Sequence, residues 1–173
     1  MLHQRKKQIV KYILYVLILF LLYILQTTPY FLVVFQGKPV WIAAAVVAIS
    51  MLEHEVTAAI FGVFAGMLWD LSSSMLFGFH ALVLLIGAVA ISLLVMHLMR
   101  VKLLNALMFT AVIMLAERLL YYFFCYLIWN RDPTGRLMLT SLLPTWGLTI
   151  LVTIPVYFLY RAVALWLDDT VRT

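Results

Sequence analysis

Six apolar stretches separated by short polar breaks dominate this 173-residue chain. We expect membrane spans at about residues 9–35, 38–52, 56–71, 75–99, 103–129 and 137–166. A helix needs about 20 apolar residues to cross a hydrocarbon core roughly 30 Å thick, and most of these stretches are long enough. Because lipid offers no hydrogen bonds to a backbone, such stretches fold as helices. The pattern predicts an all-α polytopic membrane protein with about six transmembrane helices.

Composition argues against a soluble domain of this length. Hydrophobic residues make up 66% of the chain and charged residues make up 11%, and the mean hydropathy is +1.11. Soluble domains carry roughly a quarter charged residues, which this chain could not supply to a water-facing surface. We therefore expect one integral membrane domain over residues 1–173, with the lipid bilayer as its solvent and no soluble module.

The basic residues indicate the orientation of the chain. Its net charge of +5 comes from residues that flank apolar stretches, so we expect no nucleic-acid partner. Six spans with a cytoplasmic N-terminus put eight basic residues on the inner side and three on the outer side, which agrees with the positive-inside rule. Both termini are then cytoplasmic. The inner set is Arg5, Lys6, Lys7, Lys11, Arg100, Lys102, Arg161 and Arg172, and the outer set is Lys38, Arg131 and Arg136.

Two of the middle stretches are short. Trp41 to Leu52 and Val56 to Trp69 would each cover only about 20 Å as a helix, less than the hydrocarbon core. Either both cross the membrane with extended ends, or they form a re-entrant hairpin that enters from one side. We favour two crossings, because Trp41 and Trp69 would then share one interfacial aromatic belt.

Small residues recur at every fourth position of the third stretch. Ala58, Gly62 and Gly66 lead to Asp70 at this spacing, so the four residues form one narrow stripe on a helix. Small residues in such a stripe let the backbone of a second helix approach closely in lipid. An acid inside a bilayer faces protein or water rather than acyl chains. The stripe therefore predicts the inner face of the fold.

Glu117 and Arg118 lie well inside the fifth stretch. Ionisable residues within a membrane are costly and usually mark a functional site. Because adjacent residues on a helix point about 100° apart, we expect each of the two to need its own partner. Two interpretations stay open, a functional intramembrane site and a structural lock in which Arg118 pairs with Asp70. We favour the lock.

Patterns of catalytic or metal-binding residues are incomplete in this chain. The segment Glu53 to Glu55 holds one histidine but lacks the second that a helical zinc site requires, so we interpret it as a charged cytoplasmic turn. Ser72 to Ser74, near His80, lack the nucleophile elbow of a serine hydrolase. The single cysteine, Cys125, excludes an intrachain disulfide. We expect no enzymatic activity, no cofactor and no bound metal.

Two motifs stand close together in the middle of the chain. They are GVFAGMLWD, from Gly62 to Asp70, and LFGFHAL, from Leu76 to Leu82, and Lys38-Pro39 and Glu53 precede them. This order resembles the bacterial rod shape-determining protein family MreD, most closely over residues 37–94. The resemblance implies a fold like that of the substrate-binding subunits of energy-coupling-factor transporters. It also implies a location in the bacterial plasma (inner) membrane.

The same resemblance implies a non-catalytic scaffold of the cell-elongation machinery. Members dock the bitopic protein MreC and link it, directly or indirectly, to MreB and to the RodA/penicillin-binding-protein synthase. The groove beside the glycine stripe would accept a helix of this chain or the single span of MreC. A homodimer is a further expected partner. The expected helix-packing or partner-binding residues are Ala58, Gly62, Gly66, Asp70 and Gly78.

A function of another class stays open, an uptake subunit for a small molecule such as a vitamin. Polar and aromatic groups converging on a pocket would hold such a ligand. The candidates are Asp70, His80, Glu117, Arg118 and Trp146. Ligand-dependent thermal stabilisation would favour the uptake subunit, and copurification with a bitopic partner would favour the scaffold.

Overall fold

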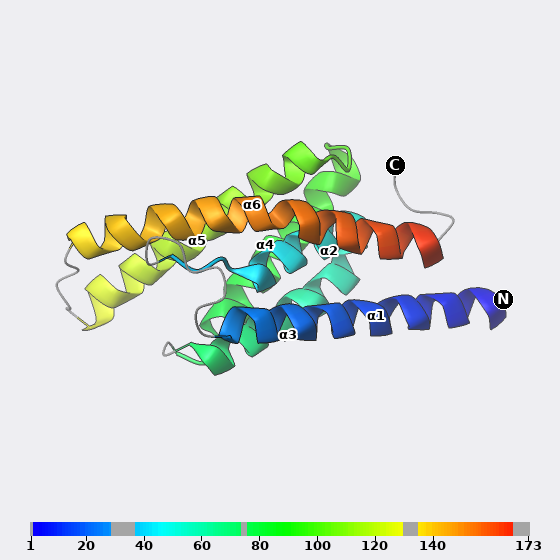
Figure 1. Ribbon diagram of the computed structural model, residues 1–173, viewed down its shortest axis with the longest axis horizontal. Coiled ribbons are helices and arrows are strands. Elements are labelled where there is room, and N and C mark those ends of the chain that lie inside the picture. The colour runs from blue at the N-terminus through cyan, green and yellow to red at the C-terminus, as the bar shows by residue number, and fades with distance from the viewer. Residues whose placement is uncertain (1, 29–36, 74–75, 130–134, 168–173) are drawn as a thin grey trace.

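The computed structural model describes residues 2–28, 37–73, 76–129 and 135–167, with side chains for all of these except 2–5 and 125–143. Regular structure in these residues consists of six α-helices (Figure 1). They are α1 (Leu2–Thr27), α2 (Trp41–Leu52), α3 (Glu55–Ser72), α4 (Phe79–His97), α5 (Leu103–Trp129) and α6 (Gly135–Leu167). The all-α class is confirmed.

Five of these helices are long and apolar enough to cross a membrane. Less than half of the most apolar window of each is buried inside the protein, so much of its apolar surface faces outward. The chain is therefore a multi-pass membrane protein, as expected. The first span was expected to reach residue 35, but α1 ends at Thr27, and residues 29–36 lie outside the described part. The five segments are Lys6–Thr27, Glu55–Ser72, Phe79–His97, Leu103–Phe124 and Pro144–Leu167.

Helix α2 differs from the others in both length and burial. It has 12 residues, and every residue from Ile42 to Leu52 is buried. A helix of this length covers about 18 Å, well short of the hydrocarbon core. It contacts all five other helices (Figure 1), a central position that a helix apolar on every side can occupy. Residues 38–52 were expected to form a span with extended ends or one arm of a re-entrant hairpin. Helix α3 reaches the length of a membrane span and α2 does not, so α2 is shorter than the span expected over 38–52.

The first turns of α1 and the last turns of α6 lie at the same end of the bundle (Figure 1, blue and red). At the opposite end, the neighbouring ends of α5 and α6 project beyond the ends of α1 and α3. Although α2 is short, the chain thus returns to the end at which it began.

The segment that leads into α2 is held by both neighbouring helices. The backbone N–H of Val40 donates to Oγ1 of Thr149 on α6 at 3.0 Å. The N–H of Ile42 donates to Oε1 of Gln26, in the last turn of α1, at 3.1 Å. Together these bonds hold Val40 and the first turn of α2 against the middle of α6 and the last turn of α1.

Candidate functional site

Helix α4 fills the groove beside the glycine stripe of α3. A Cβ atom added at Gly66 would collide with Cα of Ala81 and lie 2.6 Å from its backbone nitrogen. At Gly62 it would lie 2.8 Å from the carbonyl oxygen of Leu84 and 3.0 Å from Cβ of Ala88. The helices pack this closely because small residues face each other from both sides. Of the two occupants expected for the groove, the structure therefore contains a helix of this chain.

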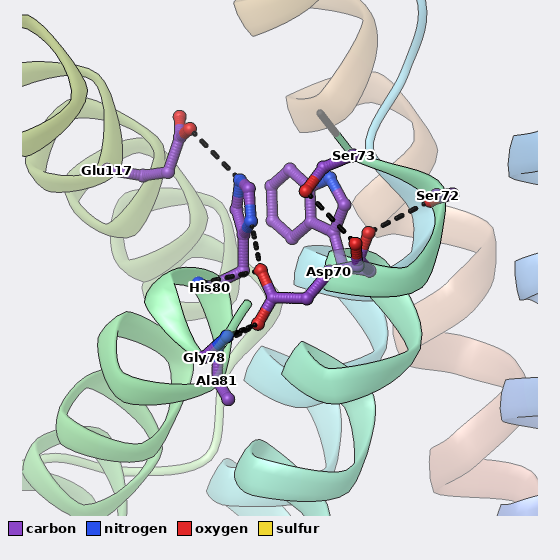
Figure 2. A network of polar contacts seen from close by, with 8 residues as sticks. Asp70, Ser72, Ser73, Gly78, His80, Ala81 and Glu117 are labelled. Carbon is purple, nitrogen blue, oxygen red and sulfur yellow. Dashed lines mark hydrogen bonds and ion pairs between the residues drawn. The ribbon is translucent and has the colours of Figure 1, made fainter. Parts of the chain in front are cut away.

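Asp70, at the end of the stripe, binds the start of α4 (Figure 2). Its carboxylate oxygens accept hydrogen bonds from the backbone N–H groups of Gly78 at 2.9 Å, His80 at 3.1 Å and Ala81 at 3.3 Å. The first N–H groups of a helix have no partner within the helix, and a negative charge there is favoured by the helix dipole. Asp70 therefore supplies from α3 the cap that α4 does not make for itself.

Gly78 acts through its backbone rather than through helix packing. Its φ of 98° lies in the left-handed region, which side chains other than glycine rarely adopt. A Cβ atom added here would meet no atom within 4 Å. Gly78 was expected to be a helix-packing or partner-binding residue. Within this chain no described residue packs against it, and it instead provides a turn that aims its N–H at Asp70. Ser72 and Ser73 close the preceding helix by donating to the carbonyls of Trp69 and Asp70.

His80 lies between two buried carboxylates (Figure 2). Its Nδ1 is 2.7 Å from Oδ1 of Asp70, and its Nε2 is 3.6 Å from Oε1 of Glu117 on α5. The ring also stacks on Trp69, with centroids 4.3 Å apart and planes at 25°. All three ionisable side chains are at most 4% exposed. A polar chain thus joins α3, α4 and α5 within the bundle.

Arg118 extends this chain towards the surface. Its Nε lies 3.0 Å from Oε2 of the adjacent Glu117, and its side chain is 33% exposed. These two atoms are close, yet they do not make a hydrogen bond of standard geometry. The expected lock between Arg118 and Asp70 is therefore wrong, because backbone donors and His80 already occupy Asp70. The expectation that the neighbours need separate partners is also corrected, since a long arginine side chain can bend back to a neighbouring glutamate.

A second buried ion pair was missed at the sequence level. Nζ of Lys11 on α1 is 2.7 Å from Oε1 of Glu53, and both side chains are at most 6% exposed. The hydroxyl of Tyr15 donates to the same carboxylate at 3.3 Å, and Ser92 on α4 donates to the Glu53 carbonyl at 2.8 Å. The contacts link α1 and α4 to the end of α2. Glu53 is therefore part of the interior rather than a solvated turn, and Lys11 is a buried partner rather than an interfacial anchor.

The five residues proposed for a small-molecule pocket do not converge on one cavity. Four of them, Asp70, His80, Glu117 and Arg118, contact one another as described above. The fifth, Trp146, donates its Nε1–H to the carbonyl of Ala111 at 3.1 Å, within the packing of α5 on α6. The structure thus brings four together as a network and leaves Trp146 out.

Neither metal ligation nor comparison with known proteins identifies the function. No group of three or more His, Cys, Asp or Glu side chains is placed to hold a metal within the part of the chain that the structure describes. The side chain of Cys125 lies outside that part. No protein-family model, curated protein or solved structure matches the chain. What the helices establish is a multi-pass membrane protein whose interior carries two networks of buried charge.

Proposed function

We propose that this protein is a non-catalytic membrane scaffold of the MreD type, working in bacterial cell elongation. In this role it docks a MreC-type bitopic protein and links it, directly or indirectly, to MreB and the RodA/penicillin-binding-protein synthase. The resemblance of Gly62–Asp70 and Leu76–Leu82 to the family supports this function. The location is the bacterial plasma membrane, with both termini cytoplasmic.

The observation that carries the proposal is that the two motifs of the resemblance contact each other in the structure. The first motif supplies the groove and the acid, and the second supplies the turn and the helix start that they receive. Asp70 and His80 both hold the start of α4, which supports a structural role for the two motifs. A rigid α3–α4 unit of this kind suits a protein that presents a fixed surface to partners.

The filled groove changes where a partner would dock. Since α4 lies against Gly62 and Gly66, the span of a bitopic partner or a second copy of the chain cannot enter there without displacing it. In the proposed function the glycines therefore act indirectly, by fixing the position of α4. Partner contacts are made by outward-facing surface.

The test is copurification from bacterial membranes. Tagged full-length protein is solubilised in mild detergent, and the MreC-type protein is measured by quantitative mass spectrometry against a tagged, unrelated multi-pass protein. We expect strong enrichment of the MreC-type partner and loss of rod shape when the protein is depleted. Absence of enrichment, together with normal cell shape after depletion, would overturn the scaffold. Stabilisation by a vitamin in that case would favour the uptake subunit instead.

A further inference from the structure

A cavity of about 530 Å³ lies at the end of the bundle where α1 and α3 end. Gln26 lines it from the last turn of α1, Trp69 and Ser72 line it from α3, and Lys38 lines it from the segment before α2. Arg118 reaches it from α5. Its volume lies within the range of roughly 300–1,000 Å³ that is usual for sites that bind small molecules.

The charges around this cavity have one sign. Lys38 and Arg118 both line it, and none of the described acidic residues does. Lys38 is exposed and lies at ion-pair distance from no carboxylate in the described part of the chain. Two cations facing a common space repel each other, and an anion between them removes that repulsion.

The charge of Arg118 is only partly balanced by protein. Its one carboxylate neighbour among the described residues, Glu117, is also approached by His80. Nε of Arg118 and Oε2 of Glu117 are both buried, and neither makes a hydrogen bond of standard geometry. A guanidinium carries five N–H donors in a planar fork that matches phosphate. Nε itself is buried beside Glu117, but the side chain is 33% exposed and lines the cavity, so the terminal NH2 groups are the donors that a ligand there would use.

Gln26 adds a further donor group to the lining. Oε1 of Gln26 accepts the N–H of Ile42, which leaves the NH2 group of the same side chain as a donor. The cavity lies beside Trp69 at the ends of two helices long enough to cross a membrane, and tryptophan is common at membrane–water interfaces, where lipid headgroups lie. Lys38 and Arg118 would offer a phosphate-bearing headgroup there two cationic partners.

We propose that this cavity binds a phosphate group through Lys38 and Arg118. The phosphate belongs either to the headgroup of an anionic lipid or to a soluble phosphate compound, and both present the same oxygen acceptors to the two cations. The site is separate from the glycine groove and does not depend on the scaffold function. Its ligand would tie the segment before α2 to α5.

The experiment uses full-length protein in nanodiscs and measures Tm. One arm compares phosphatidylcholine nanodiscs with and without phosphatidylglycerol, and the other titrates inorganic pyrophosphate into phosphatidylcholine nanodiscs. A ligand that binds the folded state raises Tm as its concentration increases. We expect stabilisation in at least one arm, and the arm that responds identifies lipid or soluble phosphate as the source. No stabilisation in either arm would overturn the proposal.

Variants assign the effect to the cavity. Lys38→Gln and Arg118→Gln should each raise the concentration for half-maximal stabilisation on the order of tenfold, the usual size of one charge-assisted hydrogen bond. Arg118→Lys should keep part of the binding. Lys102→Gln removes an exposed cation near the start of α5, outside the cavity, and serves as the matched control. Because Lys38 is exposed, its variant should fold even if Arg118→Gln does not. Unchanged binding by Lys38→Gln, or equal loss with Lys102→Gln, would contradict the assignment.

Discussion

Replacing Asp70 tests whether one carboxylate holds α3 and α4 together. In Asp70→Ala, the buried N–H groups of His80 and Ala81 lose their acceptor, as do the N–H of Gly78 and the ring of His80. A buried donor left without a partner costs about 1–3 kcal/mol, and water can reach Gly78. We expect a loss of about 3–5 kcal/mol in the free energy of unfolding for Asp70→Ala. Asp70→Asn keeps one acceptor oxygen and should lose about 1–2 kcal/mol.

The assay is unfolding in mixed micelles, with denaturing detergent as the titrant and far-UV circular dichroism as the signal. Glu55→Gln is the matched control, because it removes a carboxylate from the first turn of the same helix where no hydrogen bond to its buried oxygen is formed. The control should change stability by less than about 1 kcal/mol. If Asp70→Ala were as stable as the control, Asp70 would not be the cap of α4.

Three further predictions concern the close contact at Gly66, the buried pair of Lys11 and Glu53, and the turn at Gly78. Gly66→Ala should destabilise the protein by about 1–3 kcal/mol, because the new methyl group meets the backbone of Ala81. The same change at Gly147, where the space is open, should be neutral or stabilise by up to about 1 kcal/mol, and equal effects at both sites would contradict the packing argument. Lys11→Met should cost about 3–5 kcal/mol by leaving Glu53 buried without its cation. Adding Glu53→Gln should restore much of that loss in the same unfolding assay, whereas additive losses would show that the pair does not interact. Gly78→Ala should cost about 1–2 kcal/mol from its positive φ alone, which a melting curve of the single variant can measure against the unchanged protein.

The parts of the fold that were predictable from sequence are those with local causes. Long apolar stretches form helices because lipid leaves the backbone no other partner. The spacing of Gly62, Gly66 and Asp70 indicates a face that admits a close neighbour, because side-chain size and helical period are both local properties. What the spacing could not show is which helix fills the groove, since that depends on how the whole chain is folded.

The errors share a physical origin in tertiary context. Hydropathy treats α2 like any other apolar stretch, because it does not record whether a helix faces lipid or other helices. Lys11 follows three other basic residues, so its position predicts a cytoplasmic anchor before the first span. It is buried because Glu53, at the end of α2, pairs with it inside the bundle. The hydrogen bonds from the start of α4 to Asp70 were not predicted, because they depend on the left-handed turn at Gly78 that brings the two helices together. The one signal in the sequence was the spacing of Lys11 and Tyr15, which lie one helical turn apart and so share a face of α1. Both contact Glu53 in the structure.

The burial of α2 has a consequence for biogenesis. A translocon recognises a segment by its length and hydropathy as it leaves the ribosome, and 12 residues fall below the usual length for a stable span. Five other helices cover α2, and four of them are synthesised after it. The newborn chain must therefore hold α2 near the bilayer until α3 to α6 arrive. Its packing is complete only after α6 has been made, so a chain stalled before α6 should leave one side of this helix uncovered.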